Sequence, residues 1–137
     1  MKVSEESLSM VPDPIVVGLT LCEQVIVDRQ TRRPSAINLF SKLSVPTFPS
    51  GTQGFSVMTA LTGGSGDGTL ELFAVSLKSG ERIYSQSASI SFPDRVAVVK
   101  VSFRVRTLVF PEAGWYDFYL QVDGHTVAQR RFQVAEQ

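Results

Sequence analysis

The side chains that most often carry catalysis or bind metals are few and widely separated in this sequence. His125 is the only histidine and Cys22 the only cysteine. A zinc site of the usual cysteine and histidine type needs three or four such ligands, so one chain cannot assemble it. A nucleophilic triad would need His125 beside Cys22 or a serine, and no nucleophile-elbow motif is present. We expect His125 to be a solvated turn residue and Cys22 a buried thiol on a strand.

A glycine-rich run at residues 63–68 is similar in composition to a phosphate-binding loop. It lacks the Gly-Lys-Ser/Thr ending of that loop and runs into a strand instead of a helix, so a flexible loop between strands is the better interpretation. Calcium binding by Asp67 would need several more oxygen ligands, and only Ser65 and backbone carbonyls are near in sequence. Thirteen acidic residues are scattered along the chain without a distinguishable catalytic pair. We therefore predict no catalytic residue, no metal site and no cofactor.

Composition excludes several classes of partner. The chain has 137 residues, of which 43% are hydrophobic and 19% charged, as in an ordinary globular domain. Thirteen basic and thirteen acidic residues give zero formal net charge, which argues against a dedicated nucleic-acid or membrane-surface binder. The apolar run at residues 15–22 is too short to span a bilayer, and residues 1–8 lack the pattern of a secretory signal. With one cysteine, no internal disulfide can form, and we expect a cytoplasmic protein.

Alternation and turn residues predict an all-β chain with about eight extended segments and no helix. Residues 1–14, which include Pro12 and Pro14, are expected to form a flexible arm before a single domain at 15–137. The expected architecture is a single antiparallel β-sandwich of immunoglobulin-like, Greek-key texture. The predicted inward side chains of the first, second and sixth strands are Ile15, Val17, Leu19, Leu21, Val25 and Val27; Ile37, Leu39, Leu43 and Val45; and Val99, Val101, Phe103 and Val105.

The segment at residues 110–134 predicts a corner, a strand and a hairpin in succession. Apolar residues alternate with others from Trp115 to Val122, which is the period of a half-buried strand. A three-residue loop, 123–125, is favoured because it sets Tyr116 opposite Phe132, Leu120 opposite Ala128 and Asp117 opposite Arg131. In this register Arg130 shares the inner face with Phe118, so we expect Arg130 near a sheet edge.

Two resemblances support the all-β interpretation. The pattern Leu108-x-Phe110-x-x-x-Gly114-x-Tyr116 is similar to the tyrosine corner of immunoglobulin-like sandwiches, in which the hydroxyl bonds to upstream backbone. Three N-terminal patterns and the closing hairpin together resemble a family of short uncharacterised bacterial β-sandwich proteins. That resemblance implies a shape and no activity. Its residues are Leu21-Cys22-Glu23-Gln24-Val25-x-x-Asp28, residues 35–43, Pro46-Thr47-Phe48-Pro49, and Gly114-x-Tyr116-x-Phe118-x-x-x-Val122-Asp123-Gly124.

The outward face of the strand after this corner is the one candidate interaction surface. Trp115 and Tyr119 lie four residues apart, about 13 Å along one strand face. Outward aromatic rings can stack on sugars or form an interface hot spot, and Asp117 between them can accept hydrogen bonds. The alternative is that neighbouring side chains cover this face. Two other patterns are interpreted as solvated strand faces: the basic residues Lys100, Arg104 and Arg106, with Arg131 if the strands are adjacent, and the serines 85, 87, 89 and 91.

Two functions of different classes follow. The favoured one is a non-enzymatic module that binds another protein or its own copy through an open edge strand or the aromatic face. The alternative is a small-ligand or carbohydrate-binding sandwich that uses Trp115 and Tyr119. An enzyme that uses the scattered carboxylates is the least favoured.

Overall fold

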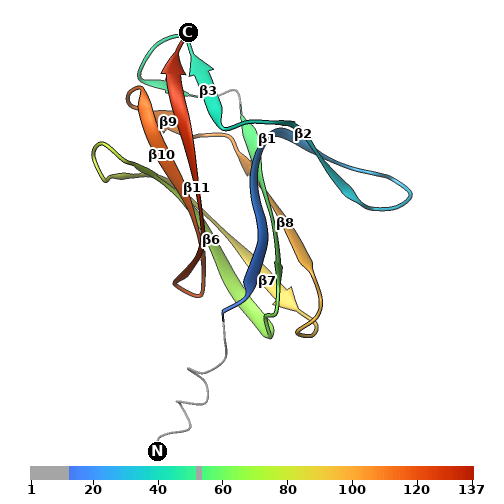
Figure 1. The fold of residues 1–137 in the computed structure, drawn as a ribbon. Helices are drawn as coiled ribbons and strands as arrows, with labels where there is room; N and C mark the ends of the chain where they lie inside the picture. The colour runs from blue at the N-terminus through green and yellow to red at the C-terminus, as the bar shows by residue number, and fades with distance from the viewer. Residues whose placement is uncertain (1–12, 52–53) are drawn as a thin grey trace, which may run out of the picture.

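A computed structural model describes residues 13–51 and 54–137, and its chain is all-β (Figure 1). The described residues contain no helix. Residues 1–12 of the predicted arm lie outside the described residues. The first strand begins at Ile15, as expected. The strands are β1 (Ile15–Val27), β2 (Pro34–Leu39), β3 (Lys42–Val45), β4 (Ser50–Gly51), β5 (Phe55–Thr62), β6 (Gly66–Ser76), β7 (Arg82–Phe92), β8 (Val99–Val105), β9 (Val109–Phe110), β10 (Gly114–Val122) and β11 (His125–Glu136).

These strands form three sheets. The first sheet has the order β2-β1-β5-β8, the second sheet has the order β3-β11-β10-β6-β7, and β4 pairs with β9. All pairs among the described residues are antiparallel except β11 with β3, which is parallel. The all-β class is therefore confirmed, whereas the expectation of purely antiparallel pairing is wrong. The predicted second strand is divided into β2 and β3, because the chain crosses from the first sheet to the second between Leu39 and Lys42.

The two large sheets face one another across a shared apolar core. Phe55 of the first sheet meets Phe118 of the second edge-on, with ring centroids 6.0 Å apart. Phe118 in turn stacks on Phe132 at 5.1 Å, and Tyr116 stacks on Phe132 at 5.8 Å. Such aromatic contacts bury large apolar areas, and the contact of Phe55 with Phe118 joins strands that are distant in sequence. The inward faces predicted for β8 and β10 lie in or against this core.

The predicted inward face of β1 is only partly correct. Leu19 and Leu21 are buried, but Ile15 and Val17 are 64% and 63% exposed. A bulge between Val16 and Gly18, in the pairing with β5, causes the difference. One extra residue in a strand moves every residue on one side of it to the opposite face. Val16 therefore packs against the core in place of its neighbours.

The hairpin of β10 and β11 has the predicted register but a different loop. Tyr116 faces Phe132 and Leu120 faces Ala128, as expected. The loop itself has two residues, Asp123 and Gly124, both with positive φ, at 49° and 87°. This is the backbone shape of a tight two-residue hairpin turn. A shift in the pairing after Leu120 absorbs the additional residue, so the predicted three-residue loop is wrong although the pairing beyond it is right.

Arg130 and Tyr116 both occupy the places expected from the sequence. Arg130 lies opposite Phe118 and is exposed, since β3 pairs with β11 only from Gln133 onward and leaves this part of β11 as an edge. The Tyr116 hydroxyl donates a hydrogen bond of 2.5 Å to the backbone carbonyl of Glu112. Burial raises the pKa of Tyr116, and the predicted tyrosine corner is present.

We expect Tyr116→Phe to lower the free energy of unfolding by about 1 kcal/mol, because the ring stays and only the corner hydrogen bond is lost. Urea denaturation followed by circular dichroism measures the change. Tyr84→Phe is the matched control, since the Tyr84 hydroxyl donates to the side chain of Gln86, two residues away on the same strand. Equal effects of the two substitutions would contradict a particular role of the corner.

Candidate interaction surfaces

The predicted aromatic surface lies on the outward face of β10, in the middle of the second sheet. Trp115 is 50% exposed, whereas Asp117 is 2% exposed. Tyr119 is half-buried, because it stacks on Phe73 of β6 with ring centroids 5.3 Å apart and an interplanar angle of 17°. The three side chains therefore share one face of β10 but differ in exposure: Trp115 is accessible, Tyr119 is half-buried and Asp117 is buried.

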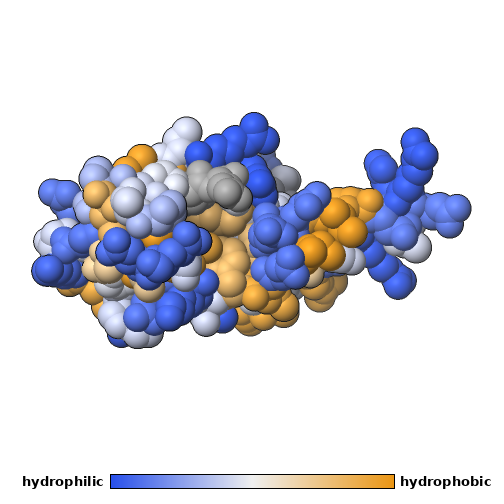
Figure 2. All heavy atoms as spheres, turned by 90° about the horizontal axis from the view of Figure 1, so that it is seen from above, coloured by the Kyte–Doolittle hydropathy of each residue, from blue (hydrophilic) through white to orange (hydrophobic). Residues whose placement is uncertain are grey.

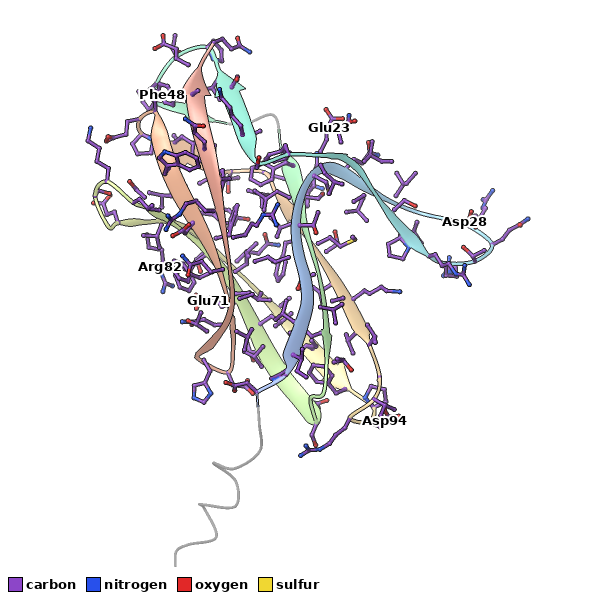
Figure 3. The ribbon with its side chains drawn as sticks, in the orientation of Figure 1. Glu23, Asp28, Phe48, Glu71, Arg82 and Asp94 are labelled. Atoms are coloured by element: carbon purple, nitrogen blue, oxygen red, sulfur yellow. The ribbon has the colours of Figure 1, made fainter. Side chains whose placement is uncertain are left out.

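The stack of Tyr119 on Phe73 is held by charged neighbours from β6 and β7. The guanidinium carbon of Arg82 lies 3.7 Å from the centre of the Phe73 ring. Arg82 also donates to Glu71 at 3.1 Å, and Ser85 donates to the same carboxylate oxygen at 2.8 Å. Figure 3 shows Arg82 and Glu71 close together on this sheet. Contacts from within the chain thus occupy one ring face of Tyr119 and one of Phe73, and Trp115 stays half exposed.

The Asp117 carboxylate is bound by side chains of β11. Its two carboxylate oxygens accept hydrogen bonds from Arg131 at 3.0 and 3.2 Å and from Gln129 at 2.8 Å. The hydrogen bond to Asp117, with the attraction of its charge, raises the pKa of Arg131. Asp117 therefore accepts hydrogen bonds, as expected, and its partners are side chains of the neighbouring strand β11, which is the arrangement of the alternative in which neighbouring side chains cover this face.

Trp115 is the one tryptophan of the chain and reports on this surface directly. Because half of its surface is exposed, we expect iodide to quench its fluorescence in the folded protein. Stern–Volmer titration of native and urea-unfolded protein measures this accessibility. Absence of quenching in the native state would contradict the placement of the ring. A blue shift on adding a sugar would instead support the carbohydrate alternative.

A second candidate surface, which the sequence did not single out, is the projecting hairpin. This name denotes residues 23–39, where β1 and β2 pair with each other beyond the rest of the first sheet. Figure 3 shows the hairpin leaving the body near Glu23 and ending near Asp28. Glu23 accepts a hydrogen bond from Asn38 at 2.8 Å, and Arg104 of β8 donates to the Glu23 carbonyl at 2.8 Å. These bonds fix the base of the hairpin to the body.

The turn of the projecting hairpin is well ordered by local bonds. The Asp28 carboxylate accepts hydrogen bonds from the backbone N–H groups of Thr31 and Gln30, both at 2.8 Å. These bonds lower the pKa of Asp28. Arg32 adopts a positive φ of 63° and donates its backbone N–H to the Asp28 carbonyl. An Asx-type turn thus closes the hairpin, and the charged side chains collect at its tip.

The shaft of the projecting hairpin exposes apolar side chains on both strands. Val27 and Ile26 of β1 are 58% and 46% exposed, and Leu39 and Ile37 of β2 are 66% and 36% exposed. Figure 2 shows this shaft as a hydrophobic stretch between the body and a hydrophilic tip. The prediction that Val27, Ile37 and Leu39 lie in the core is therefore wrong. Three successive apolar residues at 25–27 were the available signal, because they make both faces of the strand apolar.

The outer strand of the hairpin is also an unprotected edge. Natural sheets usually place charged residues on edge strands to prevent pairing with other chains. The other edges of the two large sheets follow this rule: β8 carries Lys100 and Arg104, β3 carries Lys42, and β7 carries Arg82. β2, with the sequence PSAINL, carries no charged residue. Two features of β2 discourage pairing: Pro34, its first residue, and Asn38, which has a positive φ of 56°.

A groove lies between the projecting hairpin and the outward face of the first sheet. Two adjoining hollows of about 350 and 260 Å³ share Pro34, Met58 and Lys100 in their lining. We call them together the hairpin groove. Neither hollow contains an acidic residue. The remaining lining residues are Val17, Gly18, Arg33, Thr59 and Ala60 in the first hollow and Val25, Val27, Arg32, Val101 and Ser102 in the second.

His125 and Asp67, for which no catalytic or metal-binding role was predicted, both lie near strand ends and contact other residues of the chain. His125 is the first residue of β11 and is exposed, and its Nδ1 lies 3.1 Å from Oδ1 of Asp13. The Asp67 carboxylate accepts a hydrogen bond from Ser91, and the Asp123 carboxylate accepts one from the backbone of Thr69. No group of metal-binding side chains occurs among the residues that the structure describes.

The glycine-rich run and Cys22 also have definite positions. Only residues 63–65 of the run connect β5 to β6, while Gly66 to Gly68 already belong to β6. The flexible-loop interpretation of the whole run is therefore wrong.

Cys22 is fully buried, as expected, and burial raises the pKa of its thiol. Arg131 does not extend the basic stripe of β8, because it lies in the second sheet.

Comparisons with known proteins add a family and no activity. No helix long and apolar enough to cross a bilayer occurs in the described residues. A search of curated proteins finds no match. Among solved structures, a β-glucosidase from Listeria innocua in complex with isofagomine is similar at a TM-score of 0.46 and 8% identity. The similarity covers 89% of this chain and 16% of that one, so the chain spans a small part of the enzyme's length. A family model matches residues 18–135, and the chain belongs to this family of unknown function (DUF6941).

Proposed function

We propose that this protein is a non-enzymatic protein-interaction module, bacterial and cytoplasmic, that binds another protein or its own copy. The observation that carries the proposal is the projecting hairpin with its exposed apolar shaft and its uncharged edge strand β2. An isolated two-stranded hairpin is at best marginally stable in water, and apolar side chains on both strands favour coverage by a partner. The facing sheets and the tyrosine corner support a single immunoglobulin-like sandwich as the scaffold of this module.

The carbohydrate alternative receives less support from the contacts around β10. Tyr119 has one ring face against Phe73, and the oxygens of Asp117 are engaged by Arg131 and Gln129. A sugar platform would then depend on Trp115 alone. The hairpin, in contrast, offers an open edge and apolar side chains together.

Charge placed on the hairpin tests the proposal. The double variant Ile37→Lys, Leu39→Lys adds two cations to the exposed face of β2. The matched control, Val96→Lys, Val98→Lys, adds the same charge at two valines that are 83% and 54% exposed elsewhere. Sedimentation velocity over a range of concentrations measures self-association, and affinity capture from a native lysate measures binding to other proteins.

We expect wild type and control to share a concentration-dependent species or a captured protein that the hairpin variant lacks. Circular dichroism verifies that all three proteins are folded. If wild type stays monomeric at every concentration and captures the same background as the hairpin variant, the proposal is wrong.

A further inference from the structure

We propose that the hairpin groove binds an extended polypeptide segment in which acidic side chains alternate with apolar ones. The inference rests on the proposed function, since it gives the chemistry of a partner for the same hairpin. The two sites share Val27 of the shaft but differ in what they offer, because the groove binds side chains between the hairpin and the first sheet, whereas β2 offers the open hydrogen-bonding edge of that sheet.

The floor and wall of the groove are apolar and accessible. Met58 and Ala60 of β5 are half-buried side chains on the outward face of the first sheet. Val25 and Pro34 of the hairpin line the same space and are half-buried as well. Val27, at 58% exposed, continues this apolar lining toward the tip. A ligand that brings apolar side chains into the groove would bury surface now in contact with water.

The rim of the groove carries positive charge only. Arg32 and Arg33 come from the hairpin turn, and Lys100 comes from β8 across the groove. All three are exposed, and no carboxylate among the described residues forms an ion pair with them. The whole chain has zero net charge, so this one-sided placement is local. Complementary potentials select partners and orient them, and here they select an acidic one.

The shape of the site favours a polypeptide in extended conformation. The two hollows adjoin along one groove instead of forming a single closed pocket. Successive side chains of an extended segment point to opposite sides. One set of side chains can therefore fill the apolar floor while the other set meets Arg32, Arg33 and Lys100 at the rim.

The test uses two fluorescein-labelled ten-residue peptides, one alternating valine with glutamate and the other alternating valine with lysine. Fluorescence anisotropy measures their binding to the full chain. The groove variant is Arg33→Glu, Lys100→Glu. The matched control, Arg95→Glu, Arg130→Glu, makes the same change in net charge at two exposed residues outside the groove.

We expect the glutamate peptide to bind wild type and control at least tenfold more tightly than the lysine peptide. The groove variant should lose at least tenfold in affinity for the glutamate peptide, and raised salt should weaken binding to wild type. Equal loss in groove and control variants, equal binding of both peptides, or no binding of either would overturn the inference. Binding of laurate to wild type that the groove variant lacks, without any peptide binding, would overturn the inference and assign the groove to an anionic lipid.

The two proposals fail separately. If the Ile37→Lys, Leu39→Lys variant loses a partner or oligomer and neither peptide binds wild type, the interaction module is supported and the proposed peptide site in the groove is wrong. If the glutamate peptide binds wild type and not the groove variant, and no partner or oligomer depends on Ile37 and Leu39, the groove is a binding site and the proposed role of the β2 edge is wrong.

Discussion

Phe118→Ala is expected to lower the free energy of unfolding by about 3 to 5 kcal/mol, because its ring joins the two large sheets. Phe118 is fully buried, meets Phe55 of the opposite sheet edge-on, and stacks on Phe132 of the next strand. Removing the ring deletes the aromatic contact between the sheets and leaves a cavity that the paired strands cannot close, because their hydrogen bonds fix the spacing between them.

Urea denaturation monitored by circular dichroism measures this loss. Phe118→Leu is the second variant, expected to cost about 1 to 2 kcal/mol, and it stays measurable if the alanine variant fails to fold. Val96→Ala, at a side chain that is 83% exposed, serves as the control and should change stability by less than about 0.5 kcal/mol. A cost below about 1 kcal/mol for Phe118→Ala would show that the two sheets do not share this core.

Gly64→Ala should cost about 1 to 3 kcal/mol, the expected range for inserting a methyl group into a packed site. A Cβ atom at Gly64 would lie 2.4 Å from the ring of Phe92, well inside van der Waals contact. Phe92 is itself 5% exposed and fixed in the core, so the ring has little room to move. The effect is steric, since Gly64 is not among the glycines with positive φ.

Gly18→Ala is the matched control, because a Cβ there meets nothing within 4 Å. Its expected effect on stability is small. The double variant Gly64→Ala, Phe92→Leu provides the decisive comparison: with a smaller side chain at position 92, the added methyl group should cost less than in wild type. Equal costs in the two backgrounds would exclude the clash as the cause.

This packing also explains why the glycine-rich run does not act as a phosphate loop. Gly64 passes against Phe92, and the backbone N–H of Gly63 donates to the carbonyl of Arg95 at 3.0 Å. The first part of the run is therefore in close contact with the end of β7 and with the loop that follows it. Glycine is required there for close approach, which is one of the ordinary reasons for its use in proteins.

The all-β class, the family and the pairing of β10 with β11 could be predicted from the order of residues. Alternation from Trp115 to Val122 identified the strand, and the opposition of Tyr116 with Phe132 followed from matching the two apolar patterns. The tyrosine corner and the exposed edge position of Arg130 were also predictable. The hairpin pairing and the tyrosine corner depend on residues close in sequence, where side-chain period and turn chemistry are sufficient, whereas Arg130 was placed at an edge because a charged side chain on an inward face needs access to water.

Which apolar residues are covered could be learned only from the folded chain. Alternation places side chains on two faces of a strand but does not say what lies against either face. The bulge beside Val17, the separation of β2 from β3 and the exposure of Leu39 depend on pairing between distant segments. Tyr119 stacks on Phe73, which lies 46 positions earlier in the chain. Strand neighbours are chosen by the whole fold, and this is why the projecting hairpin and its groove emerged only in three dimensions.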